Sequence, residues 1–221
     1  MDNMKLWQSV CVTAPHAVKA ITGKPYKGNS PKPYWLIERA TQVFGPVGIG
    51  WGVTVKSERF ERLTDTDVLH VAVVSVWYML DGKRTETFDQ MGGTKAAYQS
   101  KNGMVIDEDA GKKSVTDAMV KCMSMIGFAG DIFSGQWDDS KYVEWAAQET
   151  ARRESPTINE KQAADIEALI TEVGADKVAF LTWVSQMAGQ EIKRVSEMPE
   201  AASKKAIATL EKKRKPTKET A

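Results

Sequence analysis

The sequence has few of the residues on which covalent and metal chemistry depend. It contains two cysteines, Cys11 and Cys122, and two histidines, His16 and His70. The cysteines form neither a disulfide framework nor a metal-ligand spacing, and this favours a reducing cytoplasm. No serine or cysteine stands beside a histidine, so no nucleophilic triad is visible, although distant residues could assemble one in the fold. We therefore expect a protein that is not an enzyme and needs no cofactor.

Long apolar runs are also absent. No stretch of about twenty apolar residues exists, which excludes a membrane-spanning helix. The opening residues, MDNMKLWQSV, lack a basic segment followed by an apolar core, so we expect no secretory signal. With 42% hydrophobic and 27% charged residues, the composition is that of an ordinary soluble protein. We expect a cytoplasmic protein with no membrane partner.

A strong net charge is missing as well, because the formal charge is +1. The charges are nevertheless unevenly distributed. Residues 1–60 hold eight Lys or Arg against three Asp or Glu, whereas residues 61–150 hold nine against fifteen. A positive block beside an acidic one fits a charged groove, or head-to-tail contact between subunits. Random scatter of charges over the surface explains the counts equally well.

The pattern of apolar residues and turn signals predicts an α+β fold. Three strands are expected over residues 49–62, 68–80 and 83–93, with Asp81-Gly82 as a hairpin turn. The expected core is an antiparallel three-stranded sheet packed on helices, in the order β-β-β-α. The second strand is apolar on both faces, so a neighbouring subunit could cover the face that the helices leave open.

Two helices are expected to pack on this sheet. The first begins at Pro33 and ends where glycine and proline interrupt residues 44–48. The second follows residues 103–105, opens with the acids of residues 107–109 and stops at Gly127. Its apolar residues recur with helical spacing and predict one core-facing stripe. The stripe consists of Val115, Ala118, Met119, Cys122, Met123 and Ile126.

The composition changes after residue 150, which suggests a second, smaller part of the chain. We expect a core domain over residues 1–150 and a linker over residues 151–157, ARRESPT. Residues 158–213 carry three short helical patterns and predict a small C-terminal helical domain. The basic residues 214–221 are expected to form a disordered tail.

Glycines at residues 48, 50 and 52 invite comparison with a nucleotide-binding loop. They follow a helix and precede a strand, which reverses the order needed to point a helix N-terminus at a phosphate. A tight helix-to-strand turn explains these glycines better.

Two groups of acids could instead hold a metal ion for phosphoryl chemistry. They are Asp107, Glu108 and Asp109, and Asp131, Asp138 and Asp139. Three consecutive acids on a helix point in different directions, so helix capping accounts for the first group more simply. The Asp138-Asp139 pair is interpreted as a turn.

The lysines of the second helix are the remaining candidates. Lys113, Asp117, Val120, Lys121 and Ser124 are expected on the side opposite the apolar stripe. Because Asp117 is four residues from both lysines, a solvated ladder of ion pairs explains them as well as a binding surface does. Further cations favour the binding surface, since lysines neutralise phosphates and nearby aromatic rings can stack on bases. These cations are Lys101, Lys112, and Lys24, Lys27 and Lys32 in the aromatic-rich loop of residues 22–35.

At this point the order of motifs carries a resemblance. A helix ends in FG, GW follows, three strands come next, and the last helix contains the run GKKSVTDA. The chain resembles the Rad-fifty-two-like superfamily of single-strand annealing proteins, especially its bacteriophage members. The matching segments are residues 34–51, 52–92 and 107–142, and the resemblance covers roughly residues 15–145.

The resemblance implies an oligomer, a ring or a helical filament, with a basic groove that holds single-stranded DNA by its backbone. The family's groove cation on the T-D-A helix falls at Lys121, and the basic pair before it falls at Lys112 and Lys113. A further basic position falls near Lys101. Other family cations have no counterpart, because Val120, Ser124 and Trp35 stand at those positions. Cations that could compensate are Arg39, Lys24, Lys27 and Lys32.

We therefore expect a single-stranded DNA binding and annealing protein of phage recombination, acting without ATP in the cytoplasm of a bacterial host. Its partners would be single-stranded DNA, further copies of itself and, through the C-terminal region, a phage exonuclease or single-strand-binding protein. One alternative is a metal-dependent nuclease that uses the acidic groups. Another is a structural oligomer whose lysines are subunit contacts.

Overall fold

The computed structural model describes residues 3–22 and 26–214, and its contacts divide the chain into two compact units. Unit 1 is Met1–Ala147 and unit 2 is Gln148–Ala221. The division falls inside helix α5, Ser140–Arg153. Each unit has its own apolar core and is described by itself.

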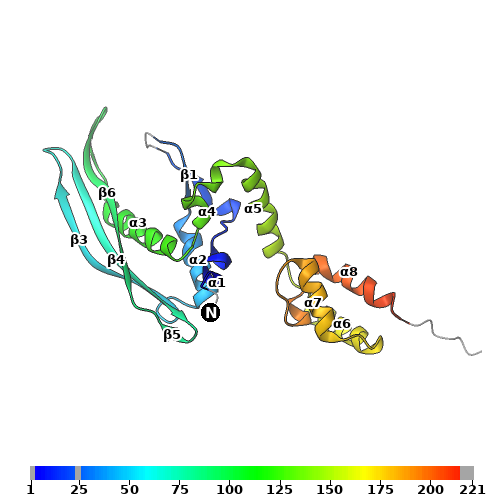
Figure 1. Ribbon diagram of the computed structural model, residues 1–221. Helices are drawn as coiled ribbons and strands as arrows, with labels where there is room; N and C mark the ends of the chain where they lie inside the picture. The colour runs from blue at the N-terminus through cyan, green and yellow to red at the C-terminus, as the bar shows by residue number, and fades with distance from the viewer. Residues whose placement is uncertain (1–2, 23–25, 215–221) are drawn as a thin grey trace, which may run out of the picture. The chain divides into compact units, whose positions relative to one another are not determined.

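Unit 1 is built on a curled antiparallel sheet (Figure 1). The sheet order is β3-β4-β6-β7, and the short strand β5 pairs with β4 outside this path. The strands are β3 Trp51–Arg62, β4 Val68–Leu80, β5 Lys83–Arg84, β6 Phe88–Ser100 and β7 Gly103–Ile106. The α+β class is thus confirmed, but the sheet has five strands, four of them in the main sheet, rather than three.

The strand count was wrong because two turns are less obvious in sequence than Asp81-Gly82. The expected third strand over residues 83–93 is two strands, since β5 ends at Arg84 and β6 begins at Phe88. The residues expected to lead into the helix form β7 instead. A tight turn makes this return, in which the Ser100 hydroxyl donates to the Gly103 carbonyl at 2.8 Å and Gly103 adopts a φ of 117°.

Helix α3, Ala110–Met125, packs directly on the sheet. Its buried Ala118 and Cys122 meet Val74 and Val76 of β4, so this part of the predicted apolar stripe faces the sheet, whereas Met123 and Ile126 belong to a second apolar core with Leu36 and Phe128. The approach is close at Gly92 of β6, where a Cβ atom would lie 2.1 Å from a carbonyl oxygen of α3. Burial also raises the pKa of the Cys122 thiol to about 11.

A second layer covers the other side of α3 (Figure 1). It contains α1 Lys5–Val10, α2 Pro33–Phe44 and α4 Gly130–Phe133. Val120, expected on the polar side of the helix, is therefore only 9% exposed, because it packs into the core between α3 and these helices. This core is formed by Val10, Leu36, Ala40, Trp51, Val120, Met123, Phe128, Ala129 and Ile132.

The glycine run after α2 makes the turn from helix to strand. A Cβ atom on Gly50 would lie 1.8 Å from the Phe44 carbonyl oxygen, and Gly48 has a φ of 86°. The chain can return toward β3 only because these positions lack side chains.

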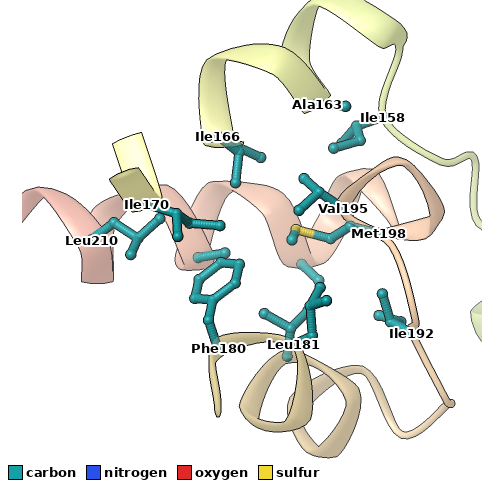
Figure 2. Close-up of a cluster of buried hydrophobic side chains, with 13 residues drawn as sticks. Ile158, Ala163, Ile166, Ile170, Phe180, Leu181, Ile192, Val195, Met198 and Leu210 are labelled. Atoms are coloured by element: carbon teal, nitrogen blue, oxygen red, sulfur yellow. The ribbon is translucent and has the colours of Figure 1, made fainter. Parts of the chain in front are cut away.

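Unit 2 is a small helical domain formed by α6 Glu160–Glu172, α7 Lys177–Ala188 and α8 Glu200–Glu211. Figure 2 shows the apolar side chains of these helices converging on one core. Asn159 and Gln162 form a capping box at the start of α6, which satisfies two backbone N–H groups.

The expected linker over residues 151–157 differs from the structure in two ways. Its first three residues belong to α5, and Arg152 donates to the carbonyl oxygens of Ala188 and Gly189 at the end of α7. Thr157 forms a β-bridge with Pro199. Of the expected tail, Arg214 pairs with Glu172 at 2.7 Å, and residues 215–221 lie outside the described residues.

Candidate functional site

An open groove of about 410 Å³ runs between a small hairpin and helix α3 in unit 1. The hairpin consists of β1 Val18–Ala20 and β2 Asn29–Pro31. One wall is formed by Lys19, Ser30, Pro31 and Pro33. The α3 wall is formed by Asp109, Lys112, Lys113, Thr116, Asp117 and Val120. Lysines therefore reach the same groove from two separate elements.

The hairpin wall is held in place by backbone contacts. Lys19 pairs with Ser30 across the hairpin, and the Lys32 N–H donates to the Ala17 carbonyl at 2.7 Å. Pro33 then occupies the first position of α2, where its fixed φ suits a helix start. The hairpin therefore continues directly into α2, and these backbone hydrogen bonds fix the position of the Lys19 backbone.

The two adjacent lysines of α3 are paired with acids of their own chain. Lys112 Nζ lies 2.9 Å from Asp109 Oδ1, and Lys113 Nζ lies 2.6 Å from Asp107 Oδ2. The hydrogen bond between Lys112 and Asp109 raises the pKa of the lysine and lowers the pKa of the acid. The bond to Asp107 likewise raises the pKa of Lys113. Both lysines stay charged at neutral pH.

The acids at the start of α3 were expected to cap the helix, but their side chains do not make the N-cap hydrogen bond. Asp109 is the N-cap residue, but its side chain does not accept a hydrogen bond from the first turn. The Asp107 carboxylate instead accepts from the Asp109 N–H at 3.1 Å. Their negative charge still lies at the helix N-terminus, where the helix dipole favours it.

Lys121 lies next to the free edge of β6. Its Nζ is 2.9 Å from Asp117 Oδ2 and 3.3 Å from the Met91 carbonyl oxygen. The same Asp117 oxygen accepts from the Gly93 N–H at 3.3 Å. The two side chains therefore satisfy backbone groups that have no neighbouring strand. The expected ladder is half present, because Lys121 pairs with Asp117 whereas Lys113 turns to Asp107.

The remaining predicted cations are spread over unit 1. Lys32 and Lys27 are exposed beside the hairpin, and Lys101 is exposed in the turn between β6 and β7. Arg39 of α2 donates to the Ser9 carbonyl at 2.7 Å, which ties α2 to the segment of α1. Lys24 lies outside the described residues.

Lys19 lines the groove and was missed from the sequence, whereas Tyr34, beside the groove, falls in the aromatic-rich loop that the sequence singled out. Lys19 belongs to a three-residue strand, which is too short to show an alternating pattern. Tyr34 follows Pro33 in the first turn of α2, and its side chain is 85% exposed. The mixture of lysines and aromatics in residues 22–35 was the available signal for Tyr34.

Asp131, one of the acids considered for metal binding, is a buried structural residue. It is 2% exposed, and its two carboxylate oxygens accept five hydrogen bonds. The donors are Thr13 N and Oγ1 at 2.7 and 2.6 Å, Ile132 N at 2.8 Å, Trp137 Nε1 at 2.9 Å and Tyr142 Oη at 3.0 Å. This carboxylate joins the segment after α1 to α4 and to the start of α5.

The other acids do not converge on an ion site either. Asp139 accepts from the Lys141 N–H at 2.8 Å at the beginning of α5. Within residues 3–22 and 26–214, no group of three or more His, Cys, Asp or Glu side chains is placed to hold a metal ion. The arrangement of the described acids therefore suits folding and lysine pairing.

No protein-family model matches this chain, and no curated protein matches it. The function is therefore argued from the groove, its lysines and their partners. Among the helices of the described ranges, none is long and apolar enough to cross a bilayer.

Proposed function

We propose that this protein binds single-stranded DNA in the groove between the β1–β2 hairpin and α3, and that it promotes annealing of complementary strands without nucleotide hydrolysis. This proposal places the chain with the Rad-fifty-two-like annealing proteins of bacteriophages. DNA phosphates would occupy the groove, and the bases would remain free to pair.

One observation carries the proposal. Lys19 from the hairpin and Lys112 and Lys113 from α3 line the same open groove. Phosphate contacts by lysine supply most of the affinity of sequence-independent binding, because they release counterions from the nucleic acid. The rest of the lining is Ser30, Pro31, Pro33, Thr116 and Val120, together with two acids, Asp109 and Asp117. The acids are paired with Lys112 and Lys121, so a phosphate in the groove would meet the lysines of both walls.

Cations beyond the groove would extend the path of the strand. Lys32 and Lys27 continue from the hairpin wall, and Lys121 lies one helical turn beyond Asp117. The exposed ring of Tyr34 beside Pro33 offers a face on which a base could stack. These residues would lengthen the contact of one subunit with the strand beyond the groove itself.

We include a homo-oligomer, a ring or a filament, in the proposal. Support comes from β7, which forms one edge of the sheet and exposes 53% of Met104 and 73% of Ile106. Exposed apolar side chains on a sheet edge are typical of surfaces that pair with another chain. Unit 2 is proposed as the part that contacts a phage exonuclease or a single-strand-binding protein.

The acidic residues favour annealing over nuclease activity. Asp131 is saturated by five donors, and Asp107, Asp109 and Asp117 are each paired with a lysine. A metal-dependent nuclease needs convergent carboxylates that are free to bind an ion. We therefore propose no nuclease activity.

The test is binding of a fluorescent oligothymidine at several salt concentrations, followed by mixing of complementary strands. The double variant Lys112→Gln/Lys113→Gln should bind about tenfold more weakly, and the steepness of log affinity against log salt should fall by about 1.4, because each phosphate contact to a single strand contributes about 0.7. Lys141→Gln changes an exposed lysine of α5 outside the groove and serves as the control. Equal affinity of the double variant and the control, or DNA cleavage with magnesium, would contradict the proposal.

A further inference from the structure

Asp107 is the most firmly held acid beside the groove. Its side chain is 20% exposed, and its two oxygens lie 2.8 and 2.6 Å from Lys113 Nζ. Its own N–H donates to the Ala96 carbonyl of β6 at 2.8 Å, and its carboxylate accepts from the Asp109 N–H at 3.1 Å. Asp107 is thus fixed by contacts to the sheet and to the start of α3.

Lys113, in contrast, can move. It lines the groove, and its side chain is 54% exposed at the end of a flexible four-carbon stem. The ammonium can therefore rotate from the carboxylate toward a phosphate in the groove, while Asp107 cannot follow it. A phosphate that enters the groove must compete with a carboxylate for the same positive charge.

We propose that Asp107 limits the DNA affinity of the groove by holding Lys113 as an internal competitor of the DNA phosphates. This inference rests on the proposed single-stranded DNA binding. The competition lowers the affinity of each subunit, so stable binding requires a strand long enough to contact several grooves. Weak binding of DNA by each subunit also suits annealing, because the duplex that forms must dissociate from the protein.

The other two lysine pairs should compete less. Lys112 and Asp109 make one short contact between side chains that are 85% and 58% exposed, so water screens the pair strongly. Asp117 is 41% exposed and also holds the Gly93 N–H, and its partner Lys121 does not line the groove. Asp107 alone combines low exposure, two contacts to a groove lysine and a fixed backbone.

The variant that tests the inference is Asp107→Asn, which keeps the side-chain shape and an oxygen for the Asp109 N–H. Oligothymidine binding should become about two- to fivefold tighter, the factor that an exposed ion pair can contribute. Asp65→Asn, in the exposed turn between β3 and β4, makes the same change of net charge and serves as the control. Asp107→Ser keeps an acceptor for Asp109 but cannot reach the ammonium, so it should behave like Asp107→Asn.

A double-mutant cycle separates competition from general repulsion between Asp107 and DNA. In a Lys113→Gln background, Asp107→Asn should no longer raise the affinity, because no ammonium remains to be released. A gain that persists in this background would overturn the inference, since it would show simple charge repulsion. Unchanged affinity of Asp107→Asn with a wild-type protein that binds DNA would also overturn it, and the proposed function would stand. If the wild-type protein does not bind oligothymidine at low salt, both the proposed function and this inference are wrong.

Discussion

Two carboxylates of unit 1 show how the surroundings of one chemical group decide its role. Asp131 is 2% exposed and accepts five hydrogen bonds from uncharged donors. Asp107 is 20% exposed and is paired with a lysine of an open groove. Neither forms part of a metal site within the described residues.

The difference lies in what can replace the present partners. Asp131 and Thr13 are buried and Trp137 and Tyr142 are half-buried, so removing the carboxylate leaves polar groups without partners in a largely dry site. The partner of Asp107 can exchange a carboxylate for water or for a phosphate at little cost. We therefore assign Asp131 to the stability of unit 1 and Asp107 to its proposed DNA-binding surface.

The largest expected effect comes from Asp131→Ala. It orphans donors from Thr13, Trp137 and Tyr142, and we expect a loss of about 3–5 kcal/mol in the free energy of unfolding. Urea unfolding followed by circular dichroism measures this loss. Asp138→Ala, at an exposed position nearby, should change stability by less than about 0.5 kcal/mol. A loss below about 1 kcal/mol for Asp131→Ala would show that water does reach these donors.

A smaller effect is expected from Tyr142→Phe, which removes one of the five donors and keeps the ring. The Tyr142 hydroxyl lies 3.0 Å from Asp131 Oδ2, and a hydrogen bond to a charged group contributes about 1.5–3 kcal/mol. Because four donors remain, we expect a loss near the lower end of that range, measured by the same urea unfolding. Tyr26→Phe changes a 58% exposed ring and is the control. Equal stability of the two variants would contradict the assigned role of Asp131.

The apolar framework of unit 1 could be predicted from the sequence because its patterns are long. Thirteen residues of β4 are rich in β-branched side chains, and α3 shows helical spacing over sixteen residues. Strand β7 has four residues and begins at a glycine, so no period was available to reveal it. Val120 was misplaced because a helical wheel shows one apolar side, whereas α3 is covered on two.

The polar contacts were harder to predict, since they join residues far apart in the chain. Asp131 meets Thr13 across 118 positions, and sequence spacing carries no sign of such a contact. Lys113 has an acid four residues away at Asp117 but binds Asp107, six residues before it. Asp107 directly follows the end of β7, and the turn between β7 and α3 places its side chain next to the first turn of the helix. Lys112 and Lys113, singled out from the sequence as DNA-binding residues, both line the groove, and DNA binding by them stays a prediction.

The smallest effects are expected from Lys121, whose contacts are partly structural, as at Asp131, and partly exposed, as at Asp107. Its ammonium is 2.9 Å from Asp117 and 3.3 Å from the Met91 carbonyl, so it helps to cover the free edge of β6. Its side chain is nevertheless 47% exposed, and an exposed pair contributes at most about 1 kcal/mol. We expect Lys121→Gln to lower the free energy of unfolding by about 0.5 kcal/mol, because glutamine can still donate to the edge carbonyl.

The same Lys121→Gln variant should weaken oligothymidine binding about twofold, less than a change at Lys112 or Lys113, because the ammonium lies outside the groove and is already shared by two acceptors. Anisotropy titrations at low salt, with Lys141→Gln as the matched control, measure the difference. A tenfold loss of affinity with unchanged stability would move the centre of the DNA path from the hairpin side of α3 to the edge of β6. Asp107 would then no longer be the acid that limits binding, and Asp117 would take that role.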